Sequence, residues 1–241
     1  MIKVEGFDFP KNGIQTSSEK RDNFRPVNTK ILSQSKNGKS FPFIRIADVI
    51  ISLFALIFFL PVFALVGTVI KMQDGGPVLF SQSRIGHKGQ EFQCYKFRSM
   101  VSNSDKALSD WLQINPFARV EWERDHKLKN DPRITKFGKF LRKTSIDELP
   151  QLWNVLKGDM SLVGPRPIVK SEISKYGKSF SFYCSVTPGV TGLWQVSGRN
   201  NVSYKRRVAL DRLFAKKKSL GVYCKILIYT VPAVLFQKGS Y

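Results

Sequence analysis

The sequence predicts an α+β protein that is mainly helical, with a re-entrant membrane helix–break–helix followed by a small membrane-associated domain that contains a short β-hairpin. Three observations lead to this fold class. An uncharged run, Val49–Ile70, carries Pro61 near its middle. Two strand-like segments follow it, with a glycine-containing turn between them. Most of the remaining chain has helical character and is divided by glycine, proline and asparagine.

The overall charge is strongly basic. The chain of 241 residues has 39 Lys and Arg against 18 Asp and Glu, a formal net charge of +21. Such an excess favours an anionic partner, namely nucleic acid, an anionic membrane surface or phosphorylated substrates. The apolar content of 42% excludes a fully disordered basic tail protein. The three cysteines and two histidines are scattered, so neither a disulfide framework nor a cysteine or histidine metal site is predicted.

We expect residues 1–40 to form a flexible basic tail and residues 41–75 to form the membrane segment. At about 1.5 Å per residue, Val49–Ile70 makes roughly 33 Å of helix, enough to cross a hydrocarbon core. Basic residues flank it on both sides, which favours both ends in the cytoplasm. Pro61 removes one helical hydrogen bond and bends the helix. A re-entrant arrangement accounts for both features, whereas a straight span accounts only for the length; a buried core helix is the third alternative.

Residues 76–241 have the pattern of a globular domain. Strands are predicted at 78–84 and 90–99, joined by the turn IGHKGQ. The glycine-rich segment 187–199 is predicted to be a loop. The apolar segment 222–236 is too short to cross a membrane and suits an interfacial or a buried helix. Further helices are predicted at 102–114, 117–127, 135–142, 147–157, 167–175 and 203–218.

Asp147 and Glu148 are the leading candidates for chemistry, because two adjacent carboxylates stand among several cations. Helix capping is the structural alternative, since Ser145 as N-cap would form a capping box with Glu148. Pro150 would then occupy a position whose N–H should already be bonded. With Asp147 as N-cap, Pro150 loses no donor, but no capping box forms. On the residues alone, a structural and a catalytic role both stay open.

Cations surround these carboxylates along the sequence. In the strand FQCYKFR, Lys96 and Arg98 have the same parity and share one face, while Tyr95 and Phe97 face the core. Two neighbouring cations can bind phosphate; a solvated sheet face is the alternative. A carboxylate pair among cations, next to a membrane segment, indicates phosphoryl transfer with a divalent metal. Further candidate phosphate contacts lie in the segments DPR, LRK and GPRP: Arg133, Arg142 and Arg166.

Four motifs, RIG, YKFRSM, LRKTSIDELPQLWNVLKGDMSLVGPRP and PGVTGLWQVSGRN, together resemble the bacterial sugar transferases, which are monotopic polyprenyl-phosphate hexose-1-phosphate transferases. The resemblance covers roughly residues 41–241, and within the family it is closest to the undecaprenyl-phosphate galactose phosphotransferases of the succinoglycan type. It implies a re-entrant membrane helix and a Mg²⁺-dependent Asp-Glu dyad. Asp147 and Glu148 match this dyad, both as catalytic residues and as metal ligands. Arg199, in the last motif, joins the candidate contacts for phosphate or nucleotide.

The resemblance also implies a covalent reaction in two steps. Asp147 would attack the β-phosphorus of a UDP-hexose and release UMP, and undecaprenyl phosphate would then take the hexose 1-phosphate from the aspartyl intermediate. Glu148 would orient the nucleophile or help to hold the metal. The implied location is the cytoplasmic face of the bacterial inner membrane, among anionic lipids, at the start of exopolysaccharide assembly. A homo-oligomer and contacts with the polysaccharide assembly machinery are compatible with it.

The resemblance leaves two alternatives for the function. Galactose is the expected sugar, with UDP-glucose as the alternative donor and residues 187–201 as the segment that reads the sugar. The alternative from another class is a membrane-anchored protein that binds polyanions through its charge of +21. No helix-turn-helix, zinc or RNP-like motif is found in the sequence, so we expect no nucleic-acid partner.

Overall fold

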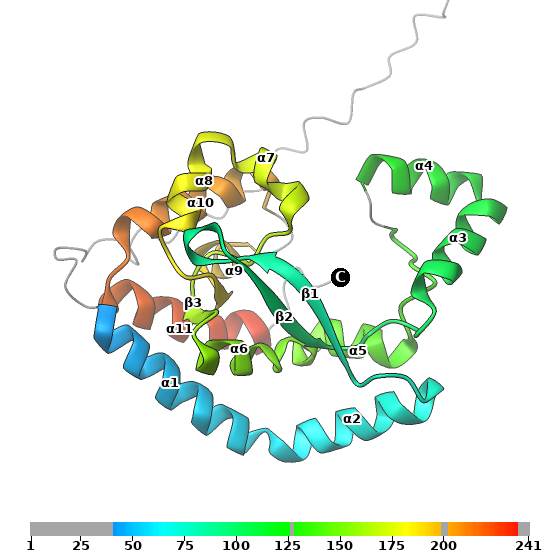
Figure 1. Cartoon of the computed structure of the whole chain (residues 1–241), viewed down its shortest axis with the longest axis horizontal. Helices are drawn as coiled ribbons and strands as arrows, with labels where there is room; N and C mark the ends of the chain where they lie inside the picture. Colours follow the sequence, from blue (N-terminus) through cyan, green and yellow to red (C-terminus); the bar gives the residue numbers. More distant parts are fainter. Residues whose placement is uncertain (1–40, 126–127, 199–201, 236–241) are drawn as a thin grey trace, which may run out of the picture.

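The computed structural model describes residues 41–125, 128–198 and 202–235. The expected tail and the candidate contact Arg199 lie outside these ranges. Within them the chain is mainly helical and contains two small two-stranded sheets, which confirms the predicted mainly helical α+β class. Figure 1 shows a bent pair of helices, α1 and α2, along one edge of the molecule, with the other elements on one side of it.

The apolar run forms α1 (Phe41–Phe58) and α2 (Leu60–Asp74), which are bent by 59° at their junction. Pro61 causes the bend because it has no N–H for the carbonyl four residues before it. The N–H groups of Phe59 and Phe63 keep their helical hydrogen bonds, each at 2.9 Å. The bend predicted from Pro61 is therefore confirmed. No single helix in the described ranges is both long and apolar enough to cross a bilayer, but the bent pair together has the necessary length and composition.

The bent pair has a packed side and an exposed side. On the packed side, α2 buries Val66 and Ile70 in a small cluster with Phe97 and Leu141. Exposed apolar surface of the extent found on the other side marks a contact with another protein or with a membrane. The exposed apolar side chains of the pair include Phe43, Ile46, Ile50, Leu53, Phe54, Ile57, Phe58, Leu60 and Leu65.

The predicted hairpin is confirmed to within two residues at each strand end. It consists of β1 (Leu79–Ile85) and β2 (Glu91–Phe97), which run antiparallel. The pair Leu79 and Phe97 stands at its open end, and a 3₁₀ turn over His87–Gly89 closes the other end. Phe97 is buried as its parity predicts, but Tyr95 is only half-buried.

Three helices follow the hairpin: α3 (Ser104–Ile114), α4 (Pro116–Asp125) and α5 (Lys136–Thr144). They agree with the helices predicted over 102–114, 117–127 and 135–142, and residues 126–127 lie outside the described ranges. Helices α3 and α4 project away from the rest of the molecule in Figure 1. The side chain of Thr135 caps α5 by accepting a hydrogen bond from the N–H of Gly138 at 2.8 Å.

The continuous helix predicted over 147–157 is wrong. The chain forms a 3₁₀ turn, η3 (Ile146–Glu148), and then a separate helix, α6 (Gln151–Lys157). Ser145 ends the preceding helix α5 in the left-handed conformation, with φ at 61°, so the chain turns before η3 begins. Pro150 becomes the N-cap of α6, where its missing N–H costs no hydrogen bond.

A second sheet forms where the sequence predicts a loop. Strand β3 (Ser161–Val163) pairs in parallel with β4 (Gly189–Thr191), and helix α9 (Leu193–Val196) follows directly. The loop prediction for 187–199 is therefore wrong. Its glycines allow close packing instead, because a Cβ on Gly189 would overlap the backbone that follows β3. Strands of three residues are too short to show the alternation from which strands are predicted.

Between the two strands of this sheet the chain forms only short helical pieces. A 3₁₀ turn over Lys170–Glu172 leads into α7 (Ile173–Tyr176), so the helix predicted over 167–175 is confirmed only in its second half. Helix α8 (Phe180–Cys184) has no predicted counterpart. The short pieces surround a small core that contains Tyr183.

The last two helices agree with the prediction. Helix α10 (Tyr204–Lys217) matches 203–218, and α11 (Leu220–Leu235) matches 222–236. The buried side of helix α11 agrees with one of the two expectations for it, and the interfacial location stays a prediction. One side is buried in the main core, and the other side exposes Tyr229. The main core is formed by α1, α6, β3, α9, α10 and α11, with large buried side chains such as Tyr223, Phe214, Met160, Leu193 and Ile226.

Two polar residues attach α1 to this core. Asp48 is 2% exposed and accepts hydrogen bonds from the N–H of Leu162 at 2.8 Å and from the hydroxyl of Tyr223 at 2.7 Å. Arg45 donates to the carbonyl oxygens of Val155 at 2.5 Å and of the next residue at 2.8 Å, near the end of α6. These contacts fix the rotation of α1, because buried polar groups require specific partners.

Gly138→Ala should lower the stability of the protein although alanine is the better helix former by about 1 kcal/mol. The added Cβ would overlap the carbonyl oxygen of Ser99, and overpacking of this kind costs about 1–3 kcal/mol. Thermal unfolding of the purified protein should therefore show a melting temperature lower by several degrees.

The matched control is Gly221→Ala in α11, where a Cβ meets nothing within 4 Å. This change should leave the melting temperature unchanged or raise it. Equal melting temperatures for the two variants would contradict the close packing of α5 on the segment that follows β2.

Candidate active site

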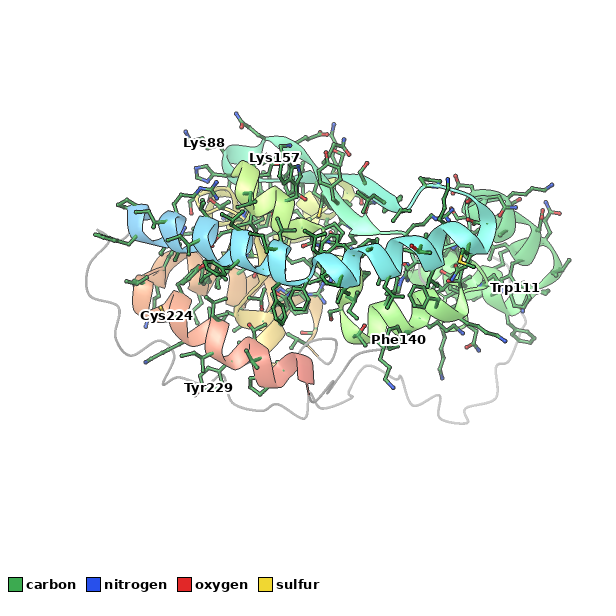
Figure 2. The ribbon with its side chains drawn as sticks, turned by 90° about the horizontal axis from the view of Figure 1, so that it is seen from below. Lys88, Trp111, Phe140, Lys157, Cys224 and Tyr229 are labelled. Atoms are coloured by element: carbon green, nitrogen blue, oxygen red, sulfur yellow. The ribbon has the colours of Figure 1, made fainter. Side chains whose placement is uncertain are left out.

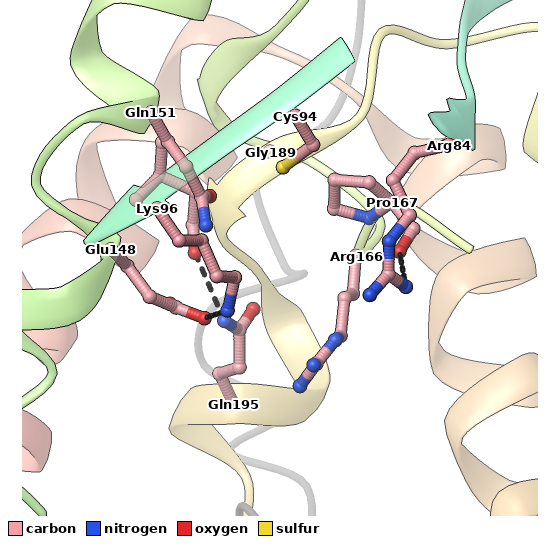
Figure 3. A pocket seen from close by; sticks show the side chains of 10 residues that line it. Arg84, Cys94, Lys96, Glu148, Gln151, Arg166, Pro167, Gly189 and Gln195 are labelled. Atoms are coloured by element: carbon pink, nitrogen blue, oxygen red, sulfur yellow. Dashed lines mark hydrogen bonds and ion pairs between the residues drawn. The ribbon is translucent and has the colours of Figure 1, made fainter. Parts of the chain in front are cut away.

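A polar pocket lies where four separate parts of the chain meet (Figure 3). The hairpin, the segment from η3 to the start of α6, the loop after β3 and the β4–α9 segment each contribute to its wall. Most of the lining side chains are polar or charged, and the cations outnumber the single carboxylate. The lining residues are Arg84, Cys94, Lys96, Glu148, Gln151, Arg166, Pro167, Gly189, Val190 and Gln195.

Lys96 contacts both carboxylates of the predicted dyad. Its Nζ is 2.6 Å from Oε1 of Glu148 and 3.8 Å from Oδ2 of Asp147. Glu148 lines the pocket directly. Asp147 is only 7% exposed and lies behind the lining. The structure thus brings both predicted catalytic residues to one lysine, with one carboxylate at the surface of the pocket and the other buried next to it.

Neither capping arrangement considered for this segment forms. Ser145 precedes η3 in a left-handed conformation and makes no side-chain cap bond. Asp147 stands inside the 3₁₀ turn rather than before a helix, and the N-cap of α6 is Pro150. The two carboxylates are therefore not used to cap a helix, which removes the structural explanation for their presence.

The buried position of Asp147 changes its acidity. Burial raises the pKa of Asp147 to about 6, because the charged form loses its water. The charge of Lys96 opposes this rise, Glu148 adds to it, and the arginines Arg142 and Arg166 oppose it. Asp147 is therefore mainly ionised at neutral pH and accepts a proton at mildly acidic pH.

Arg84 holds the loop that carries Arg166, a role that the sequence analysis missed. Its Nη1 donates to the carbonyl oxygen of Pro167 at 3.0 Å, and its Nη2 donates to Gln82 at 2.6 Å. The register of the hairpin could have predicted that Arg84 lies near Lys96. Arg84 pairs with Phe92, which has the same parity as Lys96, so the two cations lie on one face of the hairpin.

Arg142 supports the dyad from outside the pocket lining. Its Nε donates to the hydroxyl of Ser99 at 2.8 Å. Burial lowers the pKa of the Arg142 guanidinium, and the charge of Asp147 raises it. Because each group shifts the pKa of the other, Arg142 is a second cation close to the buried carboxylate of Asp147.

Two further predicted phosphate contacts, like Arg142, do not line the pocket. Arg98 is buried and paired with Asp74 at the end of α2, with Nη1 at 3.1 Å from the carboxylate. It does not share a site with Lys96, because it lies beyond the end of β2. Arg133 is paired with Asp131 at 2.7 Å. Their roles in substrate binding stay predictions that the geometry does not support.

The described residues offer two carboxylates, but no larger cluster, for a metal ion. No group of three or more His, Cys, Asp and Glu lies close enough together to hold one within the described ranges. Mg²⁺ is commonly bound by one or two carboxylates with the remaining ligands from substrate phosphates and water. Asp147 and Glu148 therefore fit an ion that arrives with a phosphorylated substrate.

Comparison with known proteins gives one consistent result. The model of the family described as bacterial sugar transferase matches residues 39–237. The chain is 48% identical to the exopolysaccharide production protein ExoY of Rhizobium meliloti, over 80% of this chain and 86% of that protein.

Two other relatives are longer than this chain. It is 55% identical to the undecaprenyl-phosphate galactose phosphotransferase of Salmonella typhimurium, over 70% of this chain and 36% of that protein. It is 36% identical to the UDP-glucose:undecaprenyl-phosphate glucose-1-phosphate transferase of Klebsiella pneumoniae, over 85% of this chain and 43% of that protein. The chain thus matches less than half of the length of each of these two relatives.

Lys96→Met should raise the pKa of Asp147 above about 6, because the lysine charge now favours the ionised carboxylate. A water-soluble carbodiimide reacts with protonated carboxyl groups, so labelling of Asp147 should persist to a higher pH in this variant. Peptide fragmentation by mass spectrometry distinguishes Asp147 from Glu148 and gives the labelling midpoint for each.

Lys157→Met is the matched control, since Lys157 pairs with Asp159 at the far end of α6. It should leave the midpoint of Asp147 unchanged. An unchanged midpoint in Lys96→Met would show that the lysine does not act on the buried carboxylate.

Proposed function

We propose, because this chain belongs to the bacterial sugar transferase family, that it transfers hexose 1-phosphate from a UDP-hexose to undecaprenyl phosphate and releases UMP. The observation that carries the proposal is the pocket in which Lys96 contacts two adjacent carboxylates opposite Arg166. A carboxylate nucleophile next to several fixed cations suits attack on a diphosphate. The product, undecaprenyl-diphosphate hexose, would start an exopolysaccharide repeat unit.

The sugar is proposed to be galactose. Relatives from Salmonella typhimurium and Erwinia amylovora are named for galactose transfer, at 55% and 52% identity. The Klebsiella pneumoniae relative is named for glucose transfer, at 36% identity. UDP-glucose is therefore the alternative donor.

The proposed reaction proceeds through a covalent aspartyl intermediate. A carboxylate oxygen of Asp147 bonds to the β-phosphorus of the UDP-hexose, and the bond from that phosphorus to the bridging oxygen breaks, so UMP leaves with the oxygen. A phosphate oxygen of undecaprenyl phosphate then bonds to the same phosphorus and releases the carboxylate. A pKa of about 6 keeps Asp147 mainly ionised at neutral pH, as a nucleophile must be.

Fixed cations have a defined role in this reaction. A carboxylate and a diphosphate repel each other, and positively charged groups that are already in place reduce this repulsion without rearranging. Arg166 and Lys96 line the pocket and can contact the phosphates, while Arg84 holds the loop of Arg166. Mg²⁺, held by Asp147 and Glu148 together with the diphosphate, would further screen the charge.

The chain is proposed to lie on the cytoplasmic face of the inner membrane, with α1 and α2 as a re-entrant pair. The exposed apolar side of the pair and its bend of 59° support this arrangement. Exposed aromatic residues support it too. Figure 2 shows Phe140 and Tyr229 on one side of the pair and Lys88 and Lys157 on the other. In this proposed arrangement the pocket must lie within reach of the phosphate of the lipid acceptor.

Asp147→Asn should abolish UMP release, lowering turnover by more than about 1,000-fold, because the amide cannot act as the nucleophile. Glu148→Gln should slow turnover by about 100-fold or more while leaving Asp147 available. UMP release by the purified protein with undecaprenyl phosphate, Mg²⁺ and UDP-galactose, compared with UDP-glucose, measures both. Removal of Mg²⁺ with EDTA should stop the reaction.

Incubation with UDP-galactose and no lipid acceptor should leave a phosphohexosyl adduct on Asp147, which peptide mass spectrometry locates. Asp110→Asn, a change of an exposed carboxylate in α3, is the matched control and should retain activity. An adduct on Glu148, or turnover by Asp147→Asn, would refute the assignment. Polyanion binding without UMP release from any UDP-sugar would favour the alternative class of function.

The re-entrant arrangement predicts that both flanks of the helix pair face the cytoplasm. Cysteines introduced as Ser40→Cys and Gln73→Cys should resist a membrane-impermeant maleimide in intact cells and react after permeabilisation. Pro61→Leu removes the cause of the bend, favours a straight span and should expose one flank. Labelling of either flank in intact cells with Pro61 present would contradict the re-entrant arrangement.

A further inference from the structure

Gln195 projects from α9 into the pocket, between the pair of Lys96 and Glu148 on one side and Arg166 on the other (Figure 3). Its Nε2 donates a hydrogen bond to the carbonyl oxygen of Val190 at 3.0 Å. Because a carbonyl can only accept, this bond sets the orientation of the amide. The other end of the amide, Oε1, is therefore the free acceptor.

This acceptor has no partner among the residues that the structure describes. Oε1 of Gln195 is buried and makes no hydrogen bond. Leaving a buried polar atom unpaired costs about 1–3 kcal/mol, so native structures rarely retain one without a reason. Because Gln195 lines the pocket, a bound molecule is the candidate source of the missing donor.

The phosphates of a nucleotide sugar cannot supply this donor. At neutral pH the diphosphate has oxygen acceptors and no hydrogen to donate, so the cations Lys96 and Arg166 suit it and an amide oxygen does not. A hydroxyl group can donate. The acceptor is therefore suited to a part of the substrate other than the phosphates.

Resting on the proposed function, we propose that Oε1 of Gln195 accepts a hydrogen bond from a hydroxyl of the hexose, which makes Gln195 a specificity-determining residue for the donor sugar. Position favours the hexose over the uridine. Gln195 lies beside Lys96 and Glu148, the groups proposed to act at the β-phosphorus. The hexose is bonded to that phosphorus through one oxygen, whereas the uridine is attached to the other phosphate.

The test pairs a change in the enzyme with a change in the substrate. Gln195→Met keeps the length of the side chain and removes the acceptor. Wild-type protein and variant are assayed for UMP release with UDP-galactose and with its 2-, 3-, 4- and 6-deoxy analogues. One analogue should lower kcat/KM of the wild-type protein by about tenfold, the value of one hydrogen bond. The same analogue should cost the variant less than about twofold, because the contact is already lost.

Inhibition by UMP separates the sugar from the nucleotide. UMP lacks the hexose, so its inhibition constant should be equal for the wild-type protein and Gln195→Met. A parallel increase in that constant would show that Gln195 reads the nucleotide, and would overturn the proposal. Gln93→Met, on an exposed position of β2, is the matched control and should behave as wild type.

The remaining outcomes are also decisive. If every deoxy analogue costs the variant as much as the wild-type protein, Oε1 is satisfied by water and the inference is wrong. If Gln195→Met does not fold, Gln195→Asn replaces it, because withdrawing the amide by one methylene should abolish the same discrimination. If wild-type protein releases no UMP from any UDP-sugar, the proposed function fails, and this inference fails with it.

Discussion

A buried carboxylate keeps its charge where cations or hydrogen-bond donors replace the water that it has lost. Asp147 meets this constraint with Lys96 from β2, Arg142 from α5 and Arg166 from the loop after β3. These residues are far apart in the sequence, so the dyad has its electrostatic environment only when three separate elements are in place. The turn η3 carries both carboxylates, and the charge of Asp147 in it depends on the positions of β2, α5 and the loop after β3.

Buried polar contacts keep those elements in position. Asn154 of α6 is fully buried, accepts a hydrogen bond from the N–H of Tyr95 at 3.0 Å and donates to the carbonyl of Gln93 at 2.7 Å. This double contact fixes β2 against α6 and so brings Lys96 to Glu148. Arg84 does the same for the loop after β3. The cations of the pocket are therefore held by polar residues that have no part in the proposed chemistry.

The sequence predicts well the features that depend on local pattern. The bend at Pro61, the hairpin and the helices α10 and α11 follow from proline chemistry, turn residues and apolar periodicity. Asp147 and Glu148 are identified by the basic residues near them in the sequence and, more firmly, by the motifs of the family. These features are visible in the sequence because their causes lie within a few residues of each other.

Features that depend on tertiary contact are not visible in the same way. Lys96 and Arg98 have equal parity, yet one contacts Glu148 and the other Asp74, because the strand ends between them. The pairing of β3 with β4 rests on glycines that read as loop residues. Gln195 is a candidate only because its buried Oε1 has no hydrogen-bond partner among the described residues. That property depends on the tertiary structure and cannot be predicted from the spacing of residues in the sequence.

The contact between Asp48 and Tyr223 joins residues 175 positions apart, and this separation bears on the order of biosynthesis. When α1 leaves the ribosome, neither of the groups that donate to Asp48 has been made. A carboxylate is costly to bury without a partner, so the side of α1 that carries Asp48 must stay in contact with water until α11 is translated. We therefore expect α1 to reach its final packing only near the end of the synthesis of the chain.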